Sequence, residues 1–424
     1  MQSHQQLHFV LEGPIRTSLP ERSRYDYTQV HVYPIEGRSI SALMSAQSRP
    51  GNKTGYLPTL DGWRCIAIVS VILYHDKGRL GPIGTLLPDQ LGALGVALFF
   101  GISGLLITSR LIEEERASGS ISLHGFYTRR ALRILPPLLV FLAALVVLHV
   151  AFDLPLAYRG IAATLVFVRN FAWNVGPPLE AWFTAHCWSL SIEEQFYFAL
   201  PLVLLLCKSW ERRTFVLGLA GIVFFVWTTF LAWRFGSSLS NAPIWQTRPG
   251  WTDMHLNGLI LGCFLAVVAS RPAYQNGIRQ FLRPSVTLPL MALLMATHYM
   301  ITPGNKRLFV LSYAALEPLF PVMVMSTVLH SGSFFSRILE WAPLRYVGRL
   351  SYSLYLWQQL FFLDVSIWPH PLPWMNRFPL SFLLTFACSA ISFYLIEKPM
   401  MRMGHRLAPP PSPGRTDLQE TSGS

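Results

Sequence analysis

Long apolar segments separated by short polar ones fill residues 56–405 of this sequence. A helix needs about 20 consecutive apolar residues to cross the roughly 30 Å of hydrocarbon in a bilayer. Ten segments come close to this length, and we expect each to form a membrane-spanning helix: 59–77, 91–111, 134–152, 188–207, 214–235, 254–270, 285–301, 308–330, 346–367 and 378–398. The stretch 160–172 is too short to cross, so we expect it to be re-entrant or to lie on the membrane surface. The pattern predicts an all-α, polytopic membrane helix bundle.

The two ends of the chain differ in composition from this middle region. Residues 1–55 are polar and rich in Arg, Ser and Gln, and they lack the apolar core of a cleavable signal peptide. Residues 406–424 are rich in Pro and Ser. We therefore expect a membrane domain over residues 56–405 between two disordered tails, with the first apolar segment inserted as a membrane span.

The positive charges are unevenly divided between the polar loops. If the N-terminus is cytosolic, 23 of the 34 Lys and Arg residues face the cytosol and 9 face the opposite side, while Arg64 and Arg349 lie inside spans. Cytosolic loops of membrane proteins carry such an excess of positive charge. The distribution predicts that both termini are cytosolic and that the number of spans is even.

The composition indicates the same class of protein. Charged residues make up 13% of the chain and hydrophobic residues 52%, and the mean hydropathy is +0.37. A soluble domain contains about 25% charged residues. The net charge of +12 therefore indicates contact with anionic membrane lipid rather than with nucleic acid. The five cysteines form no CxxC pair and lie in or beside apolar segments, so we expect packing roles and no metal site.

The first apolar segment, LDGWRCIAIVSVILYHD, contains three polar groups at membrane depth. Arg64 and His75 are eleven residues apart, so a helix places them on one face, about 16 Å apart along its axis. Asp61 falls close to the same face. Because charged groups within a membrane normally face a cavity or a partner, these residues are candidates for a catalytic site. The alternative is a structural Asp61–Arg64 pair with His75 at the membrane interface.

Three arginines follow the second apolar segment, in the sequence FYTRRALRILPP. On a helix, Arg129, Arg130 and Arg133 are neighbours at spacings of three and four residues. Three guanidinium groups at a membrane surface suit a phosphate-rich ligand such as coenzyme A. Anchoring of the cytosolic side to lipid headgroups is the alternative.

The fourth apolar segment opens with the polar sequence WSLSIEEQFY. Glu193 and Glu194 diverge by about 100° on a helix, so they cannot both point at one atom. A structural role, with one Glu paired to a buried Arg, is the alternative to a catalytic one. The polar residues that we single out in this and later segments are Trp188, Ser191, Glu193, Glu194, Tyr197, Asp253 and Tyr352. Isolated polar residues of this kind more often join helices or lie at the interface.

Six motifs occur in a fixed order: LDGWRCIAIVSVILYH, GVALFFGISGLLI, FYTRRALRILP, WSLSIEEQFYFALP, VGRLSYSLYLWQ and IEKP. Together they resemble the acyltransferase-3 family of bacterial integral-membrane O-acyltransferases, over residues 56–405. The elements Arg-x10-His and WSLSxEEQFY are highly specific in combination. The resemblance implies transfer of an acetyl or longer acyl group from cytosolic acyl-CoA, in the bacterial inner membrane. The acceptor would be a hydroxyl of a carbohydrate, a lipid-linked compound or another exported small molecule.

The resemblance also implies roles for particular residues. Arg64 and His75 match the hallmark pair of the family, and Asp61 matches the acid before that arginine. The further matches to family motifs are Arg129, Arg130, Arg133, Glu193, Glu194, Tyr197 and Asp253. Two positions depart from the family pattern. Trp251 stands where members often carry Arg, and Gln358 stands where they often carry His.

A mechanism follows as a hypothesis. Imidazole is a suitable general base near neutral pH, so we expect His75 to deprotonate the acceptor hydroxyl. Arg64, oriented by Asp61, would hold the donor or stabilise the developing oxyanion, and the three arginines would bind the phosphates of acyl-CoA. Glu193 or Glu194 would orient His75 or bind the acceptor. The other expected acceptor contacts are Trp188, Ser191, Tyr197, Asp253 and Tyr352. We expect no tightly bound cofactor.

Two other classes of function fit the same composition. A membrane transporter or flippase would also contain about ten spans with buried charges, but such proteins often have a repeated half and we find no convincing repeat. A membrane scaffold or sensor without catalysis would have no need of Asp61, Arg64 and His75. Acyl transfer in detergent separates enzyme from transporter, because vectorial transport is impossible there.

Overall fold

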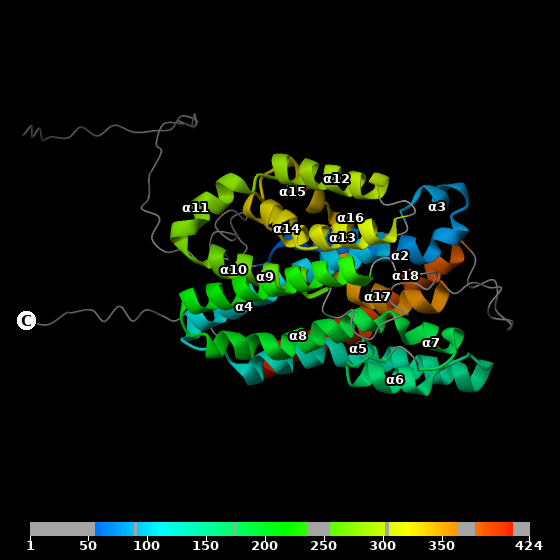
Figure 1. The fold of residues 1–424 in the computed structure, drawn as a ribbon. Helices are drawn as coiled ribbons and strands as arrows, with labels where there is room; N and C mark the ends of the chain where they lie inside the picture. Colours follow the sequence, from blue (N-terminus) through cyan, green and yellow to red (C-terminus); the bar gives the residue numbers. More distant parts are fainter. Residues whose placement is uncertain are drawn as a thin grey trace, which may run out of the picture. The chain divides into compact units, whose positions relative to one another are not determined.

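The structure is a computed structural model that describes residues 56–88, 91–172, 175–235, 255–301, 305–362 and 378–409. The chain divides into two units, residues 1–36 and 37–424, and every described residue belongs to the second. The described ranges are helical and contain no strand, which confirms the all-α prediction (Figure 1). Residues 1–55 and 410–424, most of the two predicted tails, lie outside the described ranges.

The helices follow one another along the chain with short connections. Their bounds are α2 (Pro58–Asp76), η1 (Lys77–Arg79), α3 (Pro82–Leu86), α4 (Leu91–Ser118), α5 (Leu123–Phe152), α6 (Tyr158–Leu165), α7 (Pro178–Ala185), α8 (Cys187–Leu206), α9 (Trp210–Phe235), α10 (Leu256–Ser270), α11 (Pro272–Phe281), α12 (Pro284–Ile301), α13 (Lys306–Leu316), α14 (Leu319–Leu329), α15 (Phe334–Leu339), α16 (Ala342–Arg349), α17 (Ser351–Phe361), α18 (Leu380–Ser392), the π-helical turn η5 (Phe393–Glu397) and α19 (Lys398–Leu407). The last helix therefore extends two residues into the predicted C-terminal tail.

Seven helices of the described chain are long and apolar enough to cross a membrane. They are Leu91–Ser118, Leu123–Phe152, Cys187–Leu206, Trp210–Leu231, Pro284–Ile301, Leu311–Leu329 and Leu380–Leu407, and each coincides with a predicted span. The predicted count of ten is not confirmed. The segment 254–270 gives the apolar but shorter helix α10. The segment 346–367 is divided between α16 and α17 and continues beyond the described residues.

The first predicted span, α2, has 19 residues but is not among these seven helices. Asp61, Arg64 and His75 lower its hydropathy, because charged and polar side chains are unfavourable in hydrocarbon. The same groups explain its place in the fold, since a polar helix must face protein rather than lipid. Accordingly α2 packs against α4, α16 and α17 and buries most of its length (Figure 1).

Small residues let the central helices approach closely. A Cβ atom at Gly104 of α4 would lie 2.1 Å from the carbonyl oxygen of Leu259 in α10. A Cβ atom at Gly348 of α16 would lie 1.8 Å from the carbonyl oxygen of Asp61. Neither contact leaves room for a side chain. The contact at Gly348 therefore holds the first turns of α2 against α16.

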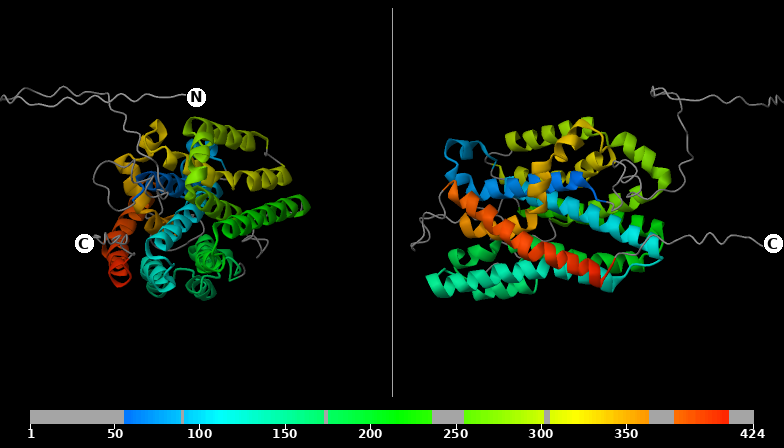
Figure 2. Two further views of the ribbon diagram at one scale, coloured as in Figure 1. Left: turned by 90° about the vertical axis from the view of Figure 1, so that its left-hand side faces the viewer. Right: turned by 180° about the vertical axis from the view of Figure 1, so that it is seen from behind.

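The helix α5 begins well before the span predicted at 134–152. The Ser122 side chain caps it by accepting a hydrogen bond of 3.1 Å from the backbone N–H of Gly125. The helix then continues through Pro136 and Pro137 to Phe152. The arginines of FYTRR therefore lie on the same helix as the apolar span. The turn η5 and the helix α19 pass beside α5, while α18 packs against α17 (Figure 2).

The stretch predicted to be re-entrant or surface-lying forms α6 and a turn behind it. Arg169 and Asn170 in this turn are 2% and 1% exposed. Asn170 and Gln195 of α8 join their side-chain amides by two hydrogen bonds of 3.0 and 3.3 Å. The turn is therefore inserted against α8 within the protein.

Candidate active site

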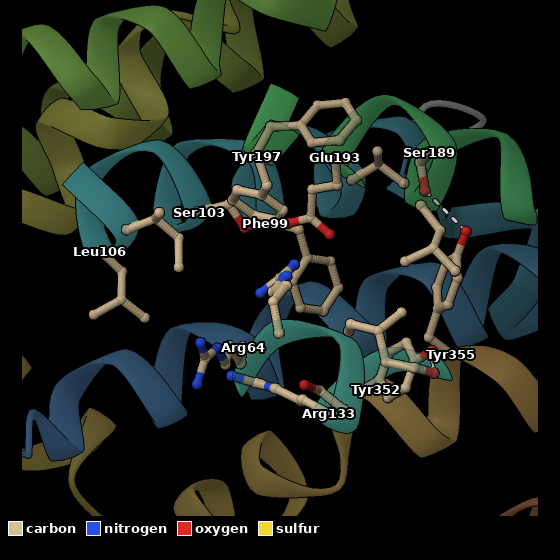
Figure 3. Close-up of a pocket in the computed structure, with 17 residues that line it drawn as sticks. Arg64, Phe99, Ser103, Leu106, Arg133, Ser189, Glu193, Tyr197, Tyr352 and Tyr355 are labelled. Carbon is tan, nitrogen blue, oxygen red and sulfur yellow. Dashed lines mark hydrogen bonds between the residues drawn. The ribbon is translucent and has the colours of Figure 1, made fainter. Parts of the chain in front are cut away.

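A pocket lies between α2, α4, α5, α8 and α17 (Figure 3). Its polar lining residues are Arg64, Ser103, Arg130, Arg133, Ser189, Glu193, Tyr197, Ser351, Tyr352 and Tyr355. Its apolar lining residues are Val96, Phe99, Phe100, Leu106, Ile107, Ile134 and Leu190. An apolar cleft with a few convergent polar groups is the usual form of a small-molecule site.

Arg64 of α2 and Arg133 of α5 project into the same end of the pocket (Figure 3). Nη1 of Arg64 lies 3.5 Å from Oδ1 of Asp61, and Asp61 accepts a hydrogen bond from the hydroxyl of Tyr56. The Asp61–Arg64 pair considered from the sequence therefore exists. It orients Arg64 without removing the guanidinium from the pocket, where that side chain stays 20% exposed.

Arg133 is only partly satisfied by the surrounding protein. Its Nε is buried and has no hydrogen-bond partner among the described residues, and the charges of Arg64 and Arg130 repel it. Glu397, at the end of the π-helical turn η5, offsets part of this positive charge and accepts a hydrogen bond of 2.8 Å from Ser353. Cations held together in a buried site favour an anionic ligand.

Arg130 lines the pocket, and its guanidinium group is bound to side chains of α8. Its Nε and Nη2 donate hydrogen bonds of 3.1 and 2.8 Å to Oε1 of Glu194. The guanidinium carbon lies 3.7 Å from the centre of the Tyr197 ring, close enough for a cation–π interaction. The structure thus pairs Glu194 with a buried arginine, the structural alternative considered from the sequence. Glu194 does not line the pocket, and it accepts its hydrogen bonds from Arg130 rather than from His75.

Glu193 points in a different direction from Glu194, as the helical spacing requires. It lines the pocket and accepts hydrogen bonds from the hydroxyls of Ser103 and Tyr197, the latter at 2.9 Å. The bond from Ser103 joins α4 to α8 in the pocket wall, where Figure 3 shows both side chains. The sequence predicts a packing role for Ser103, because a serine in a glycine-rich helix most often permits close helix approach.

Arg129 lies apart from the other two arginines of its motif. Its Nη2 donates a hydrogen bond of 2.7 Å to Oε2 of Glu114, and its Nη1 donates one of 3.1 Å to the carbonyl of Ala408. It is not among the pocket-lining residues. The expected cluster of three is therefore divided, because the buried Glu114 at the end of α4 requires a cationic partner.

His75 occupies the far end of α2. Its Nδ1 lies 2.9 Å from the carbonyl oxygen of Val71, which can only accept a hydrogen bond. Nδ1 therefore carries the hydrogen, and the lone pair of the neutral ring is on Nε2. The ring centre lies 6.1 Å from that of Trp182. Arg64 and His75 share one helix as predicted, but only Arg64 lines the pocket.

His186, which the sequence analysis did not single out, lies between the pocket wall and His75. It is 6% exposed and close enough to His75 for their charges to interact. The hydroxyl of Tyr355 donates a hydrogen bond to the carbonyl of His186, so Ser189 is the donor in its 2.8 Å bond to Tyr355. Both hydroxyls line the pocket. The position of His186, immediately before the motif CWSLS, was the signal available in the sequence.

Two expected acceptor contacts of α8 face away from the pocket. The Ser191 hydroxyl donates to the carbonyl of Cys187 at 3.0 Å and accepts from the backbone N–H of Arg169 at 3.2 Å. Trp188 packs its ring 4.8 Å from that of His255. Neither residue lines the pocket, so their observed contacts are with the protein itself.

Tyr352 does line the pocket, and its hydroxyl donates a hydrogen bond of 2.8 Å to the carbonyl of Ile134. Asp253 lies outside the described residues, as does Trp251. No group of three or more His, Cys, Asp or Glu side chains in the described part of the chain is arranged to hold a metal ion.

Comparison with known proteins places this fold in a family. The family model described as an acyltransferase domain matches residues 57–395. The chain belongs to this acyltransferase family. The matched region of the acyltransferase contains α2 to α18, and with them the helices that line the pocket.

Curated relatives agree with the family match. O-acetyltransferase OatA of Staphylococcus aureus (strain NCTC 8325 / PS 47) is 29% identical over 382 residues, 83% of this chain and 58% of the relative. Peptidoglycan O-acetyltransferase OatA of Listeria monocytogenes is 28% identical over 380 residues, 82% of this chain and 56% of the relative. The putative peptidoglycan O-acetyltransferase YrhL of Bacillus subtilis is 28% identical over 370 residues. The acyltransferase chain thus spans little more than half the length of these relatives. No solved structure matches it significantly.

Proposed function

We propose that this protein is a multi-pass membrane O-acetyltransferase that transfers an acetyl group from acetyl-CoA to a hydroxyl of a cell-envelope glycan. Family membership supports acyl transfer, and the names of the relatives support acetyl as the group and peptidoglycan as the acceptor. The observation that carries the proposal is the pocket between the helices, with two guanidinium groups at one end and a histidine-rich region beyond its other wall.

The donor binds with its phosphates at Arg64 and Arg133. These two cations face the pocket, and Arg133 keeps a buried Nε without a partner among the described residues. Arg130 contributes positive charge from its pair with Glu194 and also lines the pocket. The apolar wall is compatible with the thin pantetheine arm, which would extend from the arginines toward Tyr355. Arg129 is not part of this proposed site.

His75 acts as the general base. Its Nδ1 is held by the carbonyl of Val71, which leaves the Nε2 lone pair for the proton of the acceptor hydroxyl. The hydroxyl oxygen forms the new bond to the acetyl carbonyl carbon, the carbon–sulfur bond breaks, and the proton passes from His75 to the departing thiolate. Arg64 would stabilise the negative charge of the donor, with Asp61 fixing its orientation.

The membrane arrangement belongs to the same proposal. Ten spans with both termini in the cytosol place the arginine end of the pocket toward the cytosol, where acetyl-CoA is made, and His75 toward the opposite side. The membrane domain comprises residues 56–405, between tails of 1–55 and 406–424. The protein would reside in the bacterial inner membrane, facing the envelope.

Replacement of His75 tests the proposed base. We expect His75→Ala to reduce acetyl transfer by about 10²–10⁴-fold, the usual contribution of a general base. His330→Ala is the matched control, because His330 forms the same Nδ1 contact of 2.9 Å to the carbonyl four residues earlier. Transfer in detergent distinguishes the enzyme from a transporter or flippase. Full transfer by His75→Ala protein that is correctly inserted would disprove the role of the base.

A further inference from the structure

Trp182 of α7 is held in a fixed orientation beside His75. Its Nε1–H donates a hydrogen bond of 3.0 Å to the carbonyl of Gln359, and the side-chain amide of Gln359 donates one of 3.2 Å back to the carbonyl of Trp182. The indole and imidazole planes are nearly perpendicular, at 88°. Trp182 also remains partly exposed. An indole held rigidly beside the proposed base and partly exposed is a preformed surface for stacking.

Gln358 of α17 presents an amide with unused hydrogen-bonding capacity to the same place. The residue is fully buried and its amide lies within hydrogen-bonding reach of His75. Apart from His75, neither its Oε1 nor its Nε2 has a hydrogen-bond partner among the described residues. Leaving the hydrogen-bonding groups of a buried amide unused is unfavourable. A ligand that both donates and accepts a hydrogen bond would remove this cost.

The two ends of α2 differ in the charge of their surroundings, and this difference narrows the class of ligand expected at His75. The end at Arg64 and Arg133 is cationic. The end at His75 is formed by an indole, a carboxamide and the imidazole of His186. The nearby cation Arg169 is hydrogen-bonded to protein oxygens, including the carbonyl of Ala172 at 2.6 Å. An uncharged ring with hydroxyl groups fits this end better than an anion.

From these contacts we infer that Trp182 and Gln358 form, with His75, a subsite for a carbohydrate ring of the acceptor. This inference rests on the proposed acyl transfer. The sugar ring stacks on the indole of Trp182, and one of its hydroxyls exchanges hydrogen bonds with the amide of Gln358. The hydroxyl that reacts then faces Nε2 of His75. Trp182 and Gln358 are thus specificity-determining residues for a sugar, while Arg64 and Arg133 serve the donor.

Steady-state kinetics of substituted proteins in detergent test this subsite. The probes are acetyl-CoA and the disaccharide of N-acetylglucosamine and N-acetylmuramic acid. We expect Trp182→Ala and Gln358→Leu each to raise KM for the disaccharide by about tenfold, with KM for acetyl-CoA unchanged within about twofold. Trp182→Phe keeps an aromatic face, so we expect a smaller rise than for Trp182→Ala.

The matched control is Trp233→Ala, which removes a 57% exposed indole from α9. We expect it to leave both KM values unchanged. The subsite is wrong if KM for the disaccharide is unaffected in Trp182→Ala and Gln358→Leu, or if KM for acetyl-CoA rises equally. It is also wrong if the unsubstituted protein acetylates a simple alcohol but not the disaccharide. A separate experiment tests the role of His75 as the base: retained acetyl transfer by His75→Ala would disprove that role without deciding whether the subsite exists.

Discussion

At the scale of single residues, the partner of each side chain decides its role more than its place in a motif. Arg129 and Arg133 are one helical turn apart on α5, yet one pairs with Glu114 while the other faces the pocket with an unsatisfied Nε. Glu193 and Glu194 are adjacent, yet only Glu193 lines the pocket. Arg129 pairs with the buried carboxylate of Glu114 on α4, and Glu194 pairs with the buried guanidinium of Arg130 on α5, because a buried charge requires a partner of opposite charge.

Substitution of Arg133 and substitution of Arg129 should affect KM for acetyl-CoA differently. We expect Arg133→Gln to raise KM for acetyl-CoA by about tenfold or more, because it removes a buried cation from the donor site. Arg129→Gln should leave that KM unchanged and lower the thermal unfolding temperature, because Glu114 loses its cation. Kinetics and thermal unfolding in the same detergent check both. A larger rise in KM for Arg129→Gln would place the donor elsewhere.

At the scale of helices, the polar groups are placed by close packing between elements. The helix α2 is too polar to face lipid, so other helices surround it. The close contact at Gly348 of α16 fixes the position of the first turns of α2 relative to α16. The π-helical turn η5 ends on Glu397 and directs that carboxylate toward the arginines. Helix contacts thus define the cationic end of the pocket.

The contact at Gly348 can be tested by adding one methyl group. Gly348→Ala would place a Cβ atom 1.8 Å from the carbonyl oxygen of Asp61, so we expect a loss of about 1–3 kcal/mol in stability. The displaced α2 should also raise KM for acetyl-CoA, because Asp61 orients Arg64. Gly277→Ala of α11 is the control, since nothing lies within 4 Å of its added Cβ. Equal stability of the two variants would contradict the described contact.

At the scale of the whole molecule, the division of positive charge along the chain predicts its orientation. Seven helices of the described chain are long and apolar enough to cross a membrane, and in the proposed arrangement of ten spans α2, α10 and α17 would be the other three. Short polar or interrupted helices of this kind are tolerated where neighbouring helices cover them.

The orientation can be measured with reporters of compartment. We expect reporters fused to either terminus to be active only in the cytosol, because 23 of the 34 Lys and Arg residues then face that side. A reporter inserted after Gly78, beyond the end of α2, should be active only outside. The reverse pattern would place His75 on the cytosolic side and remove the proposed separation of donor and acceptor.

The sequence by itself determined the membrane class, the helical content and the family. These properties depend on local hydropathy and on motifs read along one helix, such as the spacing that puts Arg64 and His75 on one face. It also required Glu193 and Glu194 to diverge. Only the tertiary structure decided which of them lines the pocket, which arginines line it, and that His186, Trp182 and Gln358 surround His75. Such contacts join helices that are far apart in the chain. The pattern of residues within one segment does not show which other segment will pack against it.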